Sequence, residues 1–493
     1  MRILLFLLPL ALLFSCGNDV PPAPAMPPLN DLPLVPLPVE MIGTDGYLYV
    51  APDARADHTG ADAGAVAYLK SKDLSGIPLS TSLHPELGLK PGAYSLNIAA
   101  EGAQITAADS AGLFNGAITL AQVAAFSPDT ERGRFLPAGV ITDEPRYAYR
   151  GYMLDVARTF FGVDTVKQVI DRIATYKINH LHLHLSDDQG WRIEIKSWPG
   201  LAEIGGRFEV DGTPGGYYTQ EDYKEIVRYA AARGITIVPE IDMPGHTNAA
   251  LNAYAELNKD GKARDPYTGT AVGFSTLDAN KEITYEFVDA VVGELAAITP
   301  GPYIHLGGDE SDVTPHDDYV KFVREAQQII ISHGKKAMGW DEVAVAGLAE
   351  GTVAQLWRHT EYALMAKKLG AQVLFSPATR TYLDMQYDST SRIGLHWAAY
   401  IEVDSAYLWD PKAMVPGITD ADILGLEAPL WGETIRNIED IDYLTFPRLL
   451  ALAEVGWTLQ PKRNYEDFLR RLKAQQNWLK EMGIGTYDSR VLH

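Results

Sequence analysis

Cysteine, basic residues and long apolar runs are all scarce in this chain, and each shortage excludes something. Cys16 is the only cysteine among 493 residues, so no internal disulfide can form. The 42 Lys and Arg residues face 64 Asp and Glu residues, a formal net charge of −22. This balance argues against nucleic acid as a partner, because polyanions require clustered Lys and Arg, and it favours neutral or cationic substrates. After the first fifteen residues, no segment is long and apolar enough to span a bilayer.

The N-terminal sequence predicts an export signal. "MRILLFLLPLALLFS" has one Arg and then a short apolar run, which is typical of a secretory signal peptide. Cys16 follows directly and resembles the cysteine of a bacterial lipobox, which is lipidated and becomes the mature N-terminus. We therefore predict a signal peptide with lipobox at 1–16 and a lipid anchor in the bacterial envelope, in the periplasm or at the cell surface. The alternative is an incidental cysteine in a removed peptide.

The remaining chain divides into a tether and two domains. Residues 17–31 are Pro-rich, without a face to bury, and suit an extended tether. Residues 32–145 predict a small α+β domain, with strands at 34–41, 93–100 and 103–109 and a helix at 112–126. From 146 to 493, apolar β-rich runs alternate with amphipathic helices, the pattern of βα units around a parallel sheet.

Eight candidate strands follow residue 146. They are residues 149–157, 178–186, 235–242, 303–309, 335–340, 352–357, 372–376 and 423–431. The helices between them include residues 219–234, where Thr219 can cap the N-terminus and Gly234 can end the helix. Eight such units predict an α/β fold, a (β/α)8 TIM barrel preceded by the small α+β domain, with room for enlarged loops.

Polar and aromatic residues gather where these strands end, which is where barrel enzymes build their sites. They are Asp155, Arg158, Asp187, Asp188, Glu240, Asp242, His246, Asp309, Glu310, Trp340, Asp341, Trp357, Tyr382, Asp384, Trp431 and Glu433. Carboxylates bind vicinal hydroxyls and flat rings cover the C–H faces of a pyranose. The set therefore indicates a sugar pocket better than a phosphate or cofactor pocket.

The stretch "HLGGDE" places two carboxylates, Asp309 and Glu310, side by side at one strand end. Neighbours in sequence lie on the same side of a pocket, so they cannot be the acid and the opposing nucleophile of the usual glycosidase scheme. A 2-acetamido sugar carries its own nucleophile, the acetamido oxygen. Asp309 would hold that group while Glu310 protonates the leaving oxygen, with its pKa raised by burial and by its neighbour's charge. Gly307 and Gly308 would let backbone and ligand approach closely.

Five ordered motifs, "LDVAR", "HLHLSDDQGWR", "VPEIDMPGH", "HLGGDE" and "YLDMQY", resemble those of glycoside hydrolase family 20, the β-N-acetylhexosaminidases. The small domain also resembles that family's N-terminal module. The resemblance implies exo-hydrolysis of terminal non-reducing N-acetylhexosamine by a retaining, substrate-assisted route through an oxazolinium-type intermediate. It makes Glu310 the general acid and base and Asp309 the residue that positions the acetamido nitrogen.

The resemblance also implies roles for residues around this pair. Tyr382 would bind the acetamido oxygen, and Arg158, Asp384 and Glu433 would grip the outer hydroxyls. Trp340, Trp357 and Trp431 would form aromatic walls, and Trp409 would line the approach to the next sugar. Asp188 and His246 resemble groups that tune Glu310, with Asp187 as the alternative to Asp188. The expected partner is an oligosaccharide or glycan substrate such as a chitin oligosaccharide, with no cofactor and no metal.

Three other functions fit parts of the pattern. A lacto-N-biosidase-like enzyme on the same scaffold would release a disaccharide. A metal-dependent amide hydrolase could start from His182 and His184 on one strand face, but the later strand ends supply tryptophans instead of further ligands. In a sugar hydrolase, His180, His182 and His184 would instead be interior barrel residues. Sensitivity to chelators distinguishes the metal-dependent amide hydrolase from the sugar hydrolase. A lipid-anchored glycan-binding protein without turnover is the third. The preference for N-acetylglucosamine or N-acetylgalactosamine stays open.

Overall fold

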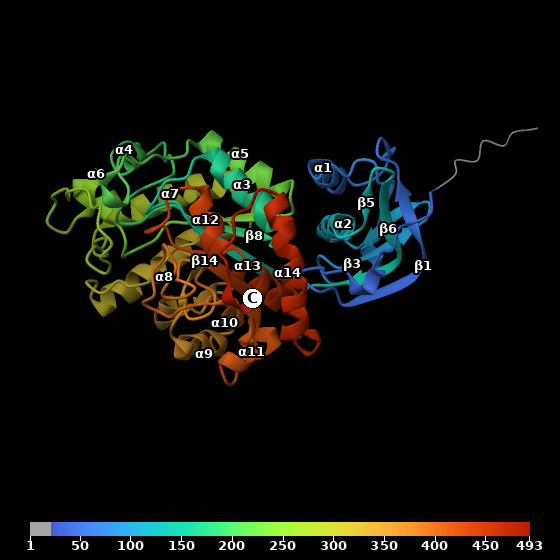
Figure 1. Cartoon of the computed structure of the whole chain (residues 1–493). Helices are drawn as coiled ribbons and strands as arrows, with labels where there is room; N and C mark the ends of the chain where they lie inside the picture. The colour runs from blue at the N-terminus through green and yellow to red at the C-terminus, as the bar shows by residue number, and fades with distance from the viewer. Residues whose placement is uncertain (1–20) are drawn as a thin grey trace, which may run out of the picture.

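The computed structural model describes residues 21–493, which form a small domain and a larger barrel (Figure 1). The predicted signal peptide and Cys16 lie outside the described residues. None of the helices in the described part is long and apolar enough to cross a membrane. Residues 21–31 are not a plain tether, because Leu29 is fully buried in the core of the small domain.

The small domain is a mixed sheet with two helices on the face toward the barrel (Figure 1). Its strands run in the order β1-β6-β3-β4-β2, with the short β5 beside β6. Their bounds are β1 Glu40–Val50, β2 Leu79–Leu83, β3 Tyr94–Ala99, β4 Gly102–Ala107, β5 Asp129–Thr130 and β6 Gly133–Asp143. The helices are α1 Ala63–Ser71 and α2 Ser110–Ala125. Nearly every residue of α2 is buried, because the sheet covers one side and the barrel the other.

The sequence predicted part of this domain. β3, β4 and α2 confirm the expected strands and helix. The strand expected at 34–41 is wrong: β1 begins at Glu40, and residues 34–39 include Pro36 and Pro38, whose nitrogens cannot donate to a sheet. The long β6, which pairs with β1 and β3 at the centre of the sheet, was not predicted.

The barrel confirms the (β/α)8 prediction. Its eight parallel strands close between β14 and β7. They are β7 Tyr149–Asp155, β8 His180–His184, β9 Thr236–Glu240, β10 Tyr303–His305, β11 Lys336–Trp340, β12 Val353–Leu356, β13 Gln372–Phe375 and β14 Ile423–Leu430. The longer helices are α3 Val163–Ala174, α5 Gln220–Ala231, α7 Glu282–Ile298, α8 His316–Ser332, α9 Thr360–Lys368, α13 Arg448–Trp457 and α14 Tyr465–Glu481. The shorter ones are α4 Gly200–Glu203, α6 Asn248–Ala253, α10 Val403–Tyr407, α11 Pro411–Met414 and α12 Ile438–Thr445.

Local chemistry accounts for where these helices lie. In α5 the Thr219 side chain accepts the Asp222 N–H and the Asp222 carboxylate accepts the Thr219 N–H, a capping box. Tyr223, Ile226 and Ala230 share one face and are buried against the barrel. Between β13 and β14 only the short α10 and α11 form, so residues 376–402 become a long loop at the carboxyl end of the barrel.

A buried ion pair joins the two domains. Lys177 lies just before β8 with its side chain 1% exposed, and its Nζ is 2.8 Å from Asp143 Oδ2 of β6 and 2.9 Å from the Tyr94 hydroxyl. The Trp457 indole donates to Asp143 Oδ1 over 2.9 Å and offers its ring face to the Lys177 ammonium. Burial lowers the pKa of Lys177, while Asp143 opposes that shift. Removing either charge leaves the other one buried and unpaired.

We expect Lys177→Met to lower the free energy of unfolding by about 3–5 kcal/mol, because Asp143 then lacks a cation inside the domain junction. The measurement is a urea titration followed by fluorescence. Lys70→Met, at an exposed position of α1, is the control and should unfold with the wild type. Identical midpoints for Lys177→Met and wild type would contradict the role of the pair.

Candidate active site

Asp309 and Glu310 follow β10 after a short turn, residues 306–308, that requires two glycines. Gly307 and Gly308 have φ angles of 71° and 96°, and a Cβ on Gly307 would lie 1.8 Å from Asp242 Oδ1. The Gly308 N–H donates to the same oxygen over 3.1 Å. The glycines thus admit the Asp242 side chain, whereas the sequence suggested room for a ligand. Glu310 itself has a φ of 43°, a left-handed conformation that is strained for a side chain of this size.

The pair opens into a cavity of about 270 Å³ at the carboxyl ends of the strands. Eight of the predicted residues line it: Arg158, Asp309, Glu310, Trp357, Tyr382, Asp384, Trp431 and Glu433. Five further residues, Thr270, Val272, Arg358, Leu395 and Trp397, were not predicted. The site therefore draws on the ends of β7, β10, β12 and β14 and on the loops that follow β9 and β13.

The edge that the sequence predicted to bind hydroxyls consists of Arg158, Asp384 and Glu433. Arg158 is fixed by Asp187, whose Oδ2 lies 2.7 Å from its Nη2, and by Asp155 at 3.4 Å. Arg158 Nε, both Asp384 carboxylate oxygens and Glu433 Oε2 are buried, and no described residue is their hydrogen-bond partner. Burial and mutual repulsion raise the pKa of Asp384, and burial raises that of Glu433. Buried polar atoms without hydrogen-bond partners in a cavity indicate a ligand that supplies those partners, such as one with several hydroxyls.

Aromatic rings form the walls of the cavity. Trp357 and Tyr382 lie parallel, with centroids 6.4 Å apart and planes 7° apart, and Trp431 lies against the Arg158 guanidinium. Trp340 is 1% exposed and packs 5.6 Å from Trp431, so it supports the wall from below instead of lining the cavity.

The prediction for Trp409 is wrong. Its indole donates to the Ala406 carbonyl in the α10–α11 segment, its ring is 8% exposed, and it lies outside the cavity. Trp397 is the ring at the cavity mouth, 57% exposed and edge-on to both Trp357 and Tyr382. An exposed indole beside a sugar pocket can stack on the next sugar.

One buried arginine holds the loop that carries Tyr382, Asp384 and Trp397. Arg448, at the start of α13, donates to the carbonyls of Leu383 and Met385 over 2.5 and 2.6 Å and to that of Ile401 over 3.0 Å. The Tyr387 ring covers its guanidinium at 3.7 Å. The loop has no regular secondary structure, so the hydrogen bonds from Arg448 satisfy carbonyl groups that backbone N–H groups would satisfy in a sheet.

Glu310 meets the requirements of a general acid. Burial first, and the Asp309 charge second, raise the pKa of Glu310, in the direction expected from the sequence. His246, Arg358 and Arg158 oppose that shift. The raised pKa shifts Glu310 toward the protonated form that a general acid needs.

Asp187 acts on Glu310 through His246, and the choice of Asp188 is wrong. His246 Nδ1 lies 3.1 Å from Asp187 Oδ1 but 3.9 Å from Asp188 Oδ2. Its Nε2 lies 3.7 Å from both Asp309 Oδ2 and Glu310 Oε2. Asp188 instead accepts the Asn248 N–H and the Ser275 hydroxyl, which fixes the loop around it.

Comparison with known proteins decides the family. The model of the "Glycosyl hydrolase family 20, catalytic domain" matches residues 147–319 and 312–460, and that of "Glycosyl hydrolase family 20, domain 2" matches residues 34–144. The chain belongs to glycosyl hydrolase family 20.

Relatives and solved structures agree with this assignment. A beta-N-acetylhexosaminidase of Cellulomonas fimi is 40% identical over 483 residues, which cover 94% of this chain and 97% of that protein. The Streptomyces plicatus N-acetyl-beta-hexosaminidase in complex with Thio-NAglucal is similar in structure, with a TM-score of 0.88, 42% identity and coverage of 94% and 98%. A mutant Streptomyces plicatus beta-hexosaminidase in complex with product (GlcNAc) gives a TM-score of 0.88, 41% identity and coverage of 95% and 99%.

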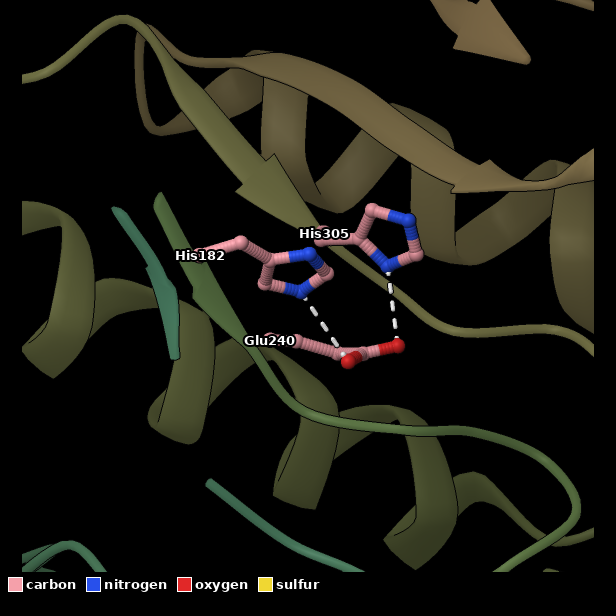
Figure 2. Close-up of side chains that lie close together, drawn as sticks. All are labelled: His182, Glu240 and His305. Carbon is pink, nitrogen blue, oxygen red and sulfur yellow. Dashed lines mark ion pairs between the residues drawn. The ribbon is translucent and has the colours of Figure 1, made fainter. Parts of the chain in front are cut away.

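In this family 20 barrel His182 and His184 of β8 belong to a buried polar core, whereas His180 at the start of the strand is only partly buried. Figure 2 shows Glu240 beneath His182 and His305, with a carboxylate oxygen 3.0 Å from a nitrogen of each ring. Glu240 also contacts His184 Nδ1 and accepts the Trp340 indole N–H over 2.9 Å. Although the three residues of Figure 2 lie as close together as metal ligands, nitrogen atoms already surround the carboxylate. The histidines are thus accounted for as core residues, as predicted for His182 and His184.

Charges alternate along this core up to the active site. Glu427 contacts His182, His182 contacts Glu240, Glu240 contacts His184, and His184 Nε2 lies 2.8 Å from Asp187. Their carboxylate neighbours raise the pKa of His182 to about 9 and that of His184 to about 10, although burial opposes both shifts. The imidazoles in turn lower the pKa values of Glu240, Glu427 and, together with Arg158, Asp187. With His246 included, three carboxylates face three imidazoliums.

Asp187→Asn and Asp188→Asn should behave differently. We expect Asp187→Asn to lower kcat/KM by about 10- to 100-fold, because Asp187 holds both Arg158 and His246 through charged contacts. Asp188→Asn should lower it less, since Asp188 contacts neither Glu310 nor Arg158. The measurement is steady-state hydrolysis of a chromogenic N-acetyl-β-glucosaminide. A larger loss in Asp188→Asn would restore the original assignment.

Proposed function

We propose that the protein is an exo-acting β-N-acetylhexosaminidase that uses the substrate's own acetamido group as nucleophile. The observation that carries this proposal is the set of buried, unpaired polar atoms around one sugar-sized cavity. Within the described part of the chain, Asp309 Oδ1, Glu433 Oε2, Arg158 Nε and both Asp384 oxygens lack hydrogen-bond partners. The hydroxyls and amide of a single N-acetylhexosamine supply those partners. The product complex with GlcNAc of a similar enzyme supports the same choice.

In the first step Glu310 gives its proton to the glycosidic oxygen while the bond from that oxygen to C1 breaks. The acetamido carbonyl oxygen attacks C1 from the opposite face and closes an oxazolinium ring. Asp309 accepts a hydrogen bond from the amide N–H, whose positive charge grows as the ring forms, and the Tyr382 hydroxyl donates to the acetamido oxygen. Trp357 and Trp431 enclose the sugar and exclude water.

In the second step Glu310, now a carboxylate, takes a proton from a water molecule. The oxygen of that water attacks C1, the C1–O bond of the oxazolinium ring breaks, and the acetamido group is restored. Two inversions at C1 give net retention, and Glu310 ends protonated as it began. This route is the substrate-assisted exception to the two-carboxylate scheme.

The cavity favours release of one sugar over release of a disaccharide. Arg158, Asp384 and Glu433 occupy the edge that grips the terminal hydroxyls, and their unpaired atoms are few enough for a single ring. Chitin oligosaccharides and glycans that end in N-acetylhexosamine carry the required group. A lacto-N-biosidase-like enzyme would need space for a second sugar beyond this edge.

Three substrates and two variants test the mechanism. Wild type should hydrolyse a p-nitrophenyl N-acetyl-β-glucosaminide at least about 10³-fold faster than the matching β-glucoside, which lacks the amide. Glu310→Gln should lower kcat on the chitin disaccharide by about 10²- to 10⁴-fold and still bind N-acetylglucosamine. Glu350→Gln, at an exposed position, is the matched control. Equal wild-type rates on the N-acetyl-β-glucosaminide and the β-glucoside would contradict participation of the acetamido group.

We further propose that the protein is exported and anchored to the bacterial envelope through a lipid on Cys16. The apolar run before Cys16 and the Pro-rich stretch after it support this location. We expect cells that produce the wild type to incorporate labelled palmitate into the protein and to retain it in the membrane fraction. Cys16→Ser should lose both the label and the membrane retention. A membrane-retained Cys16→Ser would contradict the lipid anchor.

A further inference from the structure

Arg358 is a cation at the cavity mouth that the mechanism above does not use. It follows β12 and its side chain is 39% exposed. Its Nη1 lies 3.5 Å from Glu310 Oε1 and its Nη2 lies 3.3 Å from Glu342 Oε1. Of the described cavity-lining residues, only Arg358 and Arg158 carry a positive charge, and Arg158 is committed to Asp187.

The surrounding structure fixes the Arg358 guanidinium. Its plane covers the Trp357 ring at 4.1 Å, and its Nε donates to His359 Nε2 over 2.8 Å. Asp341 Oδ2 accepts the backbone N–H groups of Trp357, Arg358 and His359 over 2.9–3.0 Å, which anchors the segment below it. A half-exposed arginine with this many restraints has a defined orientation toward Glu310.

The two oxygens of Glu310 face different cations. Oε2 lies 3.7 Å from His246 Nε2 on the core side, and Oε1 lies 3.5 Å from Arg358 Nη1 on the rim side. The other charged groups that face Glu310 are Asp309 and Arg158. Arg358 is therefore the cation closest to the solvent side, where the leaving sugar must depart.

We propose that Arg358 is a positioning residue for Glu310, which holds the carboxyl group toward the leaving oxygen and stabilises the carboxylate formed when the proton has been transferred. This inference rests on the proposed function, because it needs Glu310 to act as acid and then base. When the glycosidic oxygen takes the Glu310 proton, a full negative charge appears on Glu310. The guanidinium then gains a charge-assisted hydrogen bond that is weaker before the transfer.

The direction of the pH effect follows from the charge. Arg358 lowers the pKa of Glu310, against burial and Asp309, which raise it. Removing Arg358 therefore raises the pKa of Glu310. Since the first step needs protonated Glu310, the alkaline limb of kcat/KM should move to higher pH in a variant without the cation.

The experiment compares Arg358→Gln, Arg358→Lys and Arg233→Gln with the wild type. Arg233 is the matched control, since it also pairs with a carboxylate and stacks on an aromatic ring, Asp171 and Tyr229, but lies before β9 at the opposite end of the barrel. Each variant is assayed across pH on the chitin disaccharide, whose leaving group needs the acid, and on a p-nitrophenyl glycoside, whose leaving group needs it less.

Arg358→Gln should shift the alkaline limb upward and lower kcat on the disaccharide by about fivefold, with a smaller loss on the p-nitrophenyl glycoside. Arg358→Lys should retain most of the wild-type pH profile and most of the wild-type kcat on the disaccharide. Arg233→Gln should match the wild type. An unshifted pH profile, or a rise in KM alone, would overturn the inference. Wild type that hydrolyses neither substrate would instead refute the proposed function, so the two failures are distinguishable.

Discussion

Compensation of buried carboxylates is the constraint on which this active site depends. Glu427, Glu240 and Asp187 lie inside the barrel, where an unpaired charge would cost several kcal/mol, and imidazoles between them carry the matching positive charge. The chain of contacts ends at Asp187, which holds both Arg158 and His246. Arg158 and the histidine beside Glu310 are therefore placed by the polar core of the barrel and not by the loops alone.

The pocket departs from this rule in a way that serves binding. Among the described residues 21–493, no cation forms an ion pair with Asp384 or Glu433, and both Asp384 oxygens and Glu433 Oε2 lack hydrogen-bond partners, so these oxygens can accept hydroxyls. Glu310 is an intermediate case: burial raises its pKa, while His246 and Arg358 lower it. Its left-handed backbone, held by the Gly307–Gly308 turn packed on Asp242, adds strain of the kind that collects at catalytic positions.

Sequence reasoning succeeded where side-chain pattern and position in a strand determine the outcome. The eight barrel strands are short apolar runs with polar residues directly after them, so both the fold and most of the pocket could be predicted. It failed where tertiary contacts decide. Asp187 and Asp188 are adjacent, and only the fold shows which one turns toward His246. Trp397 lies in the irregular loop 376–402, whose path depends on Arg448 from a distant helix, whereas Trp409 lies beyond that loop, between α10 and α11. Arg358 carries no motif of its own, and its place beside Glu310 comes from the pairing of β12 in the barrel.

The central claim is that the pocket is complementary to an acetamido group closed onto C1. The most direct measurement is calorimetric binding of a thiazoline analogue of N-acetylglucosamine, in which sulfur links the acetamido carbon to C1, against binding of N-acetylglucosamine itself. The account predicts that wild type binds the bicyclic analogue at least about 100-fold more tightly, and that Asp309→Asn loses most of that preference. Equal affinities of the wild type for the two ligands would contradict it.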